Sequence, residues 1–115
     1  MALPFSTTRT EGDFIFVSGQ IALTEEGKLL DGSIVEQTHQ VMKNIQKALE
    51  LAGVSLSDIV KATIYTTDMF EYNKVSDAYI SYLTEPYPAR EFICVKELPL
   101  EAQVEISVIA KKPLI

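Results

Sequence analysis

The most regular hydrophobic pattern in the chain lies between residues 34 and 52. Apolar and small side chains recur there at intervals of three and four residues, which predicts an amphipathic helix with one buried face. These residues are Ile34, Thr38, Val41, Met42, Ile45, Leu49 and Ala52. Ser33 and Glu36 have the spacing of a capping box at the start of this helix. Gly53 is suited to end it, because glycine tolerates the left-handed conformation that closes a helix.

Other segments are rich in β-branched and aromatic residues, which predicts strands. Residues 13–21 are rich in β-branched and aromatic residues, from which we expect a strand buried on both faces, joined to the strand before it by a turn at Glu11-Gly12-Asp13. Residues 103–110 alternate, with Val104 and Ile106 on one face and Glu105 on the other. The five expected strands are 4–10, 13–21, 59–67, 91–97 and 103–110.

A second helix is predicted over residues 70–83, where Val75, Tyr79 and Tyr82 stand at helical spacing. Residues 84–88 must form a loop, because the prolines at 86 and 88 remove backbone donors. The resulting order, β-β-α-β-α-β-β, predicts an α+β domain spanning residues 1–115, with a single mixed sheet and two helices packed on one face.

This arrangement leaves the other face of the sheet uncovered. The strands at 13–21 and 59–67 nevertheless carry apolar or β-branched residues on both sides. An uncovered apolar face is typical of an association surface. We therefore expect the chain to associate with itself, as a closed ring or a dimer.

Size and charge narrow the classes of function. The 115 residues suit one domain, no apolar run approaches the roughly 20 residues of a membrane helix, and no secretory signal is expected at the N-terminus. A net charge of −6 argues against general nucleic-acid binding, which draws on clustered Lys and Arg. A single cysteine, Cys94, cannot form an internal disulfide, which fits a reducing compartment such as the cytoplasm.

Two charged residues stand out by position. Arg90 follows the proline loop at the start of a predicted strand, and its guanidinium is a rigid fork that matches a carboxylate or a phosphate. A solvated arginine or a structural ion pair explains the same position, and these are the commoner cases. Glu105 is merely polar if its strand face meets solvent. If that face is used for self-association, desolvation would raise the pKa of Glu105 toward values suited to acid–base catalysis.

Together the two runs resemble the signature of a known family. Pro88-Ala89-Arg90, then Leu98-Pro99, then Val104-Glu105-Ile106 is similar to the pattern of the Rid family, which is named after reactive intermediate deaminase A and is also called YjgF. Val17-Ser18-Gly19-Gln20-Ile21 resembles the early strand of that family. The likeness extends over nearly the whole chain.

The resemblance implies a chorismate-mutase-like fold, a homotrimer with clefts between subunits, and hydrolysis of enamines and imines such as 2-aminoacrylate to 2-keto acids and ammonia. It implies no metal and no organic cofactor. Arg90 would hold the substrate carboxylate, and Glu105 would position or activate water. Ser18 and Gly19 match residues that line the cleft. The chemistry is consistent, because an electrophilic imine carbon needs orientation and one proton-handling group.

Three positions depart from the pattern of many deaminating members. Phe5 replaces a tyrosine, Ser76 an asparagine, and Phe92 a cysteine, so the pocket wall is altered while the arginine is retained. These changes keep a second hypothesis open, a trimeric protein that binds small carboxylates or keto acids without turnover. A third, ribonuclease activity, has been attached to the family, and the acidic charge disfavours it here.

Overall fold

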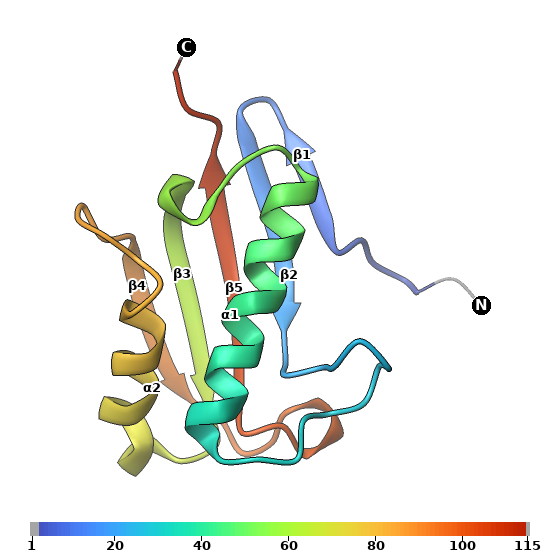
Figure 1. Ribbon diagram of the computed structural model, residues 1–115, viewed down its shortest axis with the longest axis vertical. Helices are drawn as coiled ribbons and strands as arrows, with labels where there is room; N and C mark the ends of the chain where they lie inside the picture. Colours follow the sequence, from blue (N-terminus) through green and yellow to red (C-terminus); the bar gives the residue numbers. More distant parts are fainter. Residues whose placement is uncertain (1–2, 115) are drawn as a thin grey trace.

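A computed structural model describes residues 3–114 of the chain. In these residues two α-helices cover the same face of a five-stranded sheet, whose strand order is β1-β2-β5-β3-β4 (Figure 1). The elements are β1 Thr8–Glu11, β2 Phe14–Gln20, α1 Ile34–Leu51, β3 Ile59–Thr66, α2 Tyr72–Ile80, β4 Ala89–Cys94 and β5 Val104–Lys111. The single mixed sheet, the helices on one face and the order of elements confirm the predicted fold class.

The sheet is mixed because α2 connects two parallel neighbours. β3 and β4 pair in parallel, from Lys61 opposite Ala89 to Thr66 opposite Cys94, whereas the other neighbouring strands are antiparallel. Parallel strands need a crossover connection, and α2 supplies it. This pairing places the start of β4, including Arg90, beneath α2.

Local signals account for α1. Glu36 N donates to Ser33 Oγ over 3.1 Å, and Ser33 N donates to Glu36 Oε1 over 2.9 Å, so the predicted capping box is present. Gly53, with φ of 85°, follows the helix in the left-handed region. Among the described residues, neither α1 nor any other helix is long and apolar enough to cross a bilayer.

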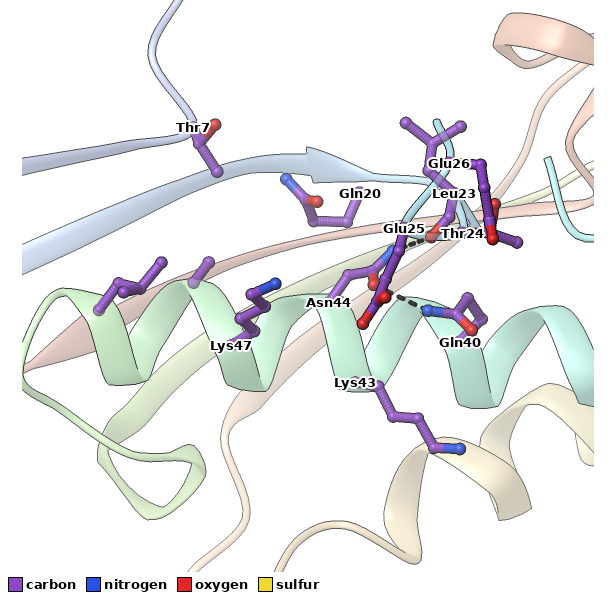
Figure 2. Close-up of a pocket in the computed structure, with 12 residues that line it drawn as sticks. Thr7, Gln20, Leu23, Thr24, Glu25, Glu26, Gln40, Lys43, Asn44 and Lys47 are labelled. Atoms are coloured by element: carbon purple, nitrogen blue, oxygen red, sulfur yellow. Dashed lines mark hydrogen bonds between the residues drawn. The ribbon is translucent and has the colours of Figure 1, made fainter. Parts of the chain in front are cut away.

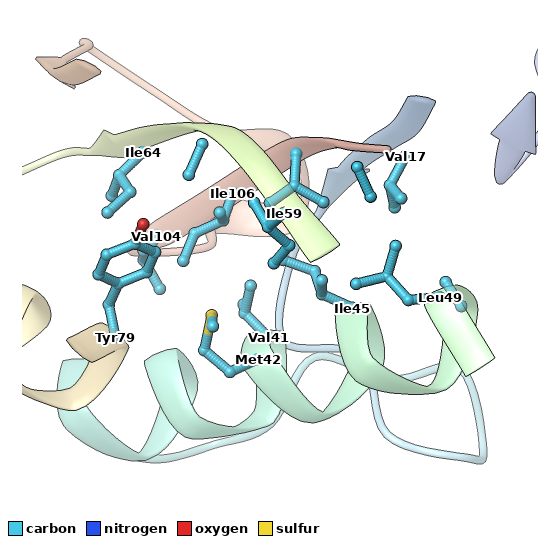
Figure 3. Close-up of a cluster of buried hydrophobic side chains, with 14 of the residues drawn as sticks. Val17, Val41, Met42, Ile45, Leu49, Ile59, Ile64, Tyr79, Val104 and Ile106 are labelled. Carbon is cyan, nitrogen blue, oxygen red and sulfur yellow. The ribbon is translucent and has the colours of Figure 1, made fainter. Parts of the chain in front are cut away.

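The hydrophobic core lies between the helices and the sheet (Figure 3). Val41, Ile45 and Leu49 of α1 point toward the sheet and are fully buried. Tyr79 reaches from α2 toward Ile64 and Val104, and its side chain is 1% exposed. Burial of these side chains stabilises the fold by about 1.5–3 kcal/mol for each large apolar residue, before the entropy of ordering is subtracted.

Several predicted boundaries were wrong. The first strand begins at Thr8 rather than residue 4, and β4 spans Ala89–Cys94 rather than 91–97, since its ends follow its register with β3. The second helix begins at Tyr72 and ends at Ile80, inside the predicted 70–83. It is preceded by a short 3₁₀ turn, at which the Asp68 carboxylate accepts from Phe70 N over 3.0 Å.

The expectation that residues 13–21 are buried on both faces was also wrong for the single chain. Ile15 and Val17 are buried beneath the helices, but Phe14 and Phe16 on the open face are 41% and 43% exposed. Strand alternation puts successive side chains on opposite faces, and only one face of this sheet is covered. The open face therefore retains large apolar side chains in contact with solvent.

Two tyrosine hydroxyls near α2 give a matched test of the core. Tyr79 OH is buried without a hydrogen-bond partner, whereas Tyr82 OH is hydrogen-bonded to His39 Nδ1 at 2.9 Å. We expect Tyr79→Phe to raise the free energy of unfolding by up to about 1 kcal/mol and Tyr82→Phe to lower it by about 1 kcal/mol. Denaturant unfolding measures both. A clear loss of stability in Tyr79→Phe would mean that its hydroxyl has a partner.

Candidate functional site

Arg90 is held on the helix side of the sheet by α2. Its Nη1 donates to Ser76 Oγ over 2.8 Å, and its Nη2 donates to the Tyr72 hydroxyl. Tyr72 and Ser76 are four residues apart in α2, so their side chains lie on one face of the helix, above β4. Two hydroxyl groups from one helix thus orient both terminal nitrogens of the guanidinium.

Aromatic rings surround the same guanidinium. Its Cζ atom lies 5.5 Å from the ring centroid of Tyr72 and 5.6 Å from those of Tyr79 and Phe92. The rings of Tyr72 and Phe92 also contact each other, with centroids 4.5 Å apart. Cation–π attraction stabilises a charge in such a setting by about 0.5–2 kcal/mol per ring. We call Arg90, Tyr72, Ser76, Tyr79 and Phe92 the arginine cluster.

The arginine cluster contains no negative charge. Within residues 3–114 the ion pairs are Arg9–Glu11, Lys61–Glu91 and Lys74–Glu71, and Arg90 belongs to none of them. Arg90 is half-buried, yet its hydrogen-bond partners there are neutral hydroxyls. A partly desolvated guanidinium with free N–H donors attracts a carboxylate or a phosphate. The predicted anion-binding role of Arg90 therefore has suitable surroundings, and the alternative of a structural ion pair does not apply to the described residues.

Glu105 lies on the open face of the sheet, opposite in direction to Val104 and Ile106 as its alternation predicted. Its carboxyl group leans over Gly19 of β2, where a Cβ atom would lie 2.8 Å from Glu105 Cδ. Only glycine leaves room for this arrangement. Partial burial raises the pKa of Glu105 above its ordinary value, because desolvation disfavours the charged form.

Ser18 joins this region to the residues before β1. The register of β2 against β5 shifts between Val17 and Gln20, which places Ser18 and Gly19 in an irregular stretch. Ser18 Oγ donates to the Ser6 carbonyl over 2.6 Å. Phe5, the next residue back, is 58% exposed. We call Glu105, Gly19 and Ser18 the glutamate cluster.

The sheet separates the two clusters within one chain. Arg90 pairs with Ala62, which is fully buried beneath the helices, whereas Glu105 pairs with Tyr65 on the open face. Because side chains alternate along a strand, Arg90 projects from the helix-covered face of the sheet and Glu105 projects from its open face. The structure thus brings Ser76 and Phe92 to Arg90, and Gly19 to Glu105. It does not bring the two clusters together.

Sequence reasoning missed Tyr72 and understated Tyr79. Both belong to the arginine cluster, but the sequence alone placed Tyr79 only in an apolar helix face and did not single out Tyr72. A usable signal was the four-residue spacing between Tyr72 and Ser76, which puts a tyrosine beside any residue that Ser76 contacts.

A separate cavity of about 760 Å³ lies between α1 and the loop after β2 (Figure 2). Lys43 and Lys47 of α1 and Glu25 of the loop are among its lining residues, and neither Arg90 nor Glu105 is. Asn44 Nδ2 donates to the Leu23 carbonyl over 3.0 Å and so ties the loop to α1. The cavity is lined by both basic and acidic side chains, and Asn44 is used to hold the loop in place. This cavity is therefore not the candidate site.

Gly19→Ala tests the contact within the glutamate cluster. The added methyl group takes the space of the Glu105 carboxyl, so we expect that carboxyl to swing toward solvent. The pKa of Glu105 then falls toward the ordinary range, because water can solvate its charged form better. A carboxyl NMR titration of both proteins measures this.

The pH dependence of stability gives a second reading of the same variant. A raised folded-state pKa means that the native protein binds the Glu105 proton more tightly than the unfolded chain does. The free energy of unfolding therefore decreases as pH rises above about 4.3, the ordinary glutamate value. We expect this decrease to be smaller in Gly19→Ala than in the wild-type protein. An unchanged Glu105 pKa in the variant would contradict the contact.

Comparisons with known proteins identify relatives of the whole chain. A family model described as endoribonuclease L-PSP matches residues 1–112. The chloroplastic Reactive Intermediate Deaminase A of Arabidopsis thaliana is 37% identical over 108 residues, which are 93% of this chain and 58% of that protein. The crystal structure of RidA from an Antarctic Psychrobacter is similar with a TM-score of 0.91 and 33% identity, covering 96% of this chain and 90% of that one. The structure of E. coli TdcF with bound serine has a TM-score of 0.89 and 26% identity, covering 98% and 91%. The chain therefore belongs to the Rid family.

Proposed function

We propose that the chain is an enamine/imine deaminase, which hydrolyses 2-aminoacrylate and its 2-imino acid tautomer to the 2-keto acid and ammonia. The observation that carries the proposal is the Arg90 guanidinium, which is oriented by two hydroxyls and has no carboxylate partner among residues 3–114. The relative named Reactive Intermediate Deaminase A supports the reaction class. The serine bound to TdcF supports a ligand with an α-carboxylate.

The proposed reaction needs orientation and proton transfer. Arg90 binds the substrate carboxylate, which holds the neighbouring C=N carbon in place. Water adds to that carbon, and the C–N bond then breaks to release ammonia and leave the C=O group. Glu105 accepts a proton from the attacking water and passes it to the imine nitrogen, and it then carries the remaining hydroxyl proton of the addition product to the same nitrogen as the C–N bond breaks. Its raised pKa favours the step in which Glu105 accepts a proton, because a partly desolvated carboxylate binds a proton more tightly.

The imine carbon is already electrophilic, so we propose that the reaction uses no metal or organic cofactor. Ser18, Gly19, Phe5, Ser76 and Phe92 are proposed to line the pocket. We further propose the cytoplasm as the compartment, where the exposed thiol of Cys94 would stay reduced. Ribonuclease activity, which the name of the family model carries, is not proposed, because the chain has a net charge of −6.

We propose that the active unit is a homotrimer with its sites between subunits. Arg90 and Glu105 point from opposite faces of one sheet, so a single ligand can meet both only if they come from different copies. A closed ring achieves this by setting the α2–β4 edge of one copy against the open sheet face of the next. Phe14 and Phe16 on the open face, and Ile93 on β4, are exposed apolar residues that such packing would cover.

Turnover of 2-aminoacrylate generated in situ tests the reaction. We expect Arg90→Ala to lower kcat/KM by about 100-fold or more, because a charged carboxylate contact is lost. We expect Glu105→Gln to lower kcat by about 100- to 10,000-fold, because proton transfer is lost. Lys47→Ala, which removes an exposed cation from the separate cavity beside α1, is the control and should keep full activity.

Two outcomes separate the candidate functions. If wild type and Arg90→Ala act alike, the deaminase proposal fails. If wild type binds 2-ketobutyrate in calorimetry but does not accelerate the decay of the imine, the chain is instead a carboxylate-binding protein, which the altered residues at 5, 76 and 92 would then explain.

Mixed assemblies test the shared site. Inactive Arg90→Ala and Glu105→Gln chains are unfolded together in equal amounts and refolded. If each site takes Arg90 from one copy and Glu105 from another, roughly a quarter of the sites regain both residues, and roughly a quarter of the wild-type activity returns. Each variant refolded alone is the control. Sedimentation should give the mass of a trimer, and mixtures that stay inactive at that mass would place both residues of a site in one chain.

A further inference from the structure

The Tyr72 hydroxyl holds a proton that the arginine cluster does not use. A guanidinium has N–H donors and no acceptor, so in its hydrogen bond with Arg90 Nη2 the Tyr72 oxygen must be the acceptor. A hydroxyl that accepts a hydrogen bond still has its own proton to donate. Within residues 3–114 the structure provides no acceptor for the Tyr72 proton. This donor is therefore available to a ligand next to Arg90.

We propose that Tyr72 is a further substrate-binding residue, whose hydroxyl donates to the same carboxylate that Arg90 binds. The inference rests on the proposed function and adds a second kind of donor to its anion site. A carboxylate has two oxygens with about four lone-pair positions, so a bidentate contact with Arg90 leaves room for another donor. The hydrogen bond from Arg90 also polarises the Tyr72 O–H group and makes it a stronger donor.

Exposure distinguishes Tyr72 from the other tyrosine of the cluster. Tyr79 is 1% exposed, and its hydroxyl is buried without a partner, so a ligand cannot reach it. Tyr72 is 36% exposed and begins α2, at the edge of the structure where α2 and β4 meet. Contact with the Phe92 ring, at 4.5 Å between centroids, and the bond to Arg90 fix its orientation. Its hydroxyl is thus both accessible and positioned before a ligand arrives.

Calorimetry with 2-ketobutyrate tests the inference without needing turnover. We expect Tyr72→Phe to weaken binding by about 10-fold, because a hydrogen bond to a charged group is lost while the ring is kept. Tyr82→Phe is the matched control. It removes a hydroxyl bonded to His39 and not to Arg90, and affinity should stay within about twofold. Wild-type affinity in Tyr72→Phe, or no binding of 2-ketobutyrate by the wild-type protein, would overturn the inference.

A second background separates direct binding from support of Arg90. If Tyr72 acts only by holding the guanidinium, Tyr72→Phe should have no effect once Arg90 is replaced by lysine, which lacks the fork. If Tyr72 donates to the carboxylate itself, the double variant should bind about threefold or more weakly than Arg90→Lys alone. Equal affinities of these two proteins would reduce Tyr72 to a supporting role and refute the proposal.

Turnover is measured on the same proteins as an independent reading. The carboxylate does not react, so Tyr72→Phe should raise KM and leave kcat nearly unchanged. Wild-type binding without turnover would remove the deaminase proposal and leave the Tyr72 inference standing. Turnover with an unchanged KM in Tyr72→Phe would refute the Tyr72 inference and leave the deaminase proposal standing.

Discussion

Side chains alternate between the two faces of a β-strand, and the helices of this protein cover only one face of its sheet. This constraint determines where each functional group can act. Arg90 shares the covered face with α2, and Glu105 shares the open face with Gly19. Neither side chain can pass through the sheet. The proposed site needs both side chains and would therefore form between copies, and the same packing would cover the exposed Phe14 and Phe16 of the open face.

The arginine cluster shows how a cation can be partly buried without an ion pair. Removing a charge from water is unfavourable unless other groups compensate. Here the hydroxyls of Tyr72 and Ser76 accept from both ends of the guanidinium, and the faces of three aromatic rings add attraction. None of these groups neutralises the charge. The cluster keeps Arg90 oriented and leaves it able to bind an anion, which an intramolecular carboxylate would have prevented.

The glutamate cluster is built on a different physical principle. Glu105 belongs to none of the ion pairs within residues 3–114, and desolvation raises its pKa. The close approach to Gly19 holds the carboxyl against the sheet rather than in solvent. One half of the proposed site thus keeps a charge that attracts the substrate. The other half holds a carboxyl whose proton is bound more tightly than usual, which suits proton transfer.

Local patterns in the sequence were sufficient for the elements and the fold class. The capping box at Ser33, the apolar period of α1 and the alternation around Glu105 act over a few residues, so they can be read directly. The register of β4 against β3 could not be read in this way, because pairing between distant strands sets it. The same is true of the contacts among Tyr72, Ser76 and Arg90, which join α2 to β4 across a loop. The sequence by itself thus determined the fold class and named Arg90 and Glu105. Only the tertiary structure decided that they lie on opposite faces and that Tyr72 belongs beside Arg90, because both facts depend on how distant segments pack.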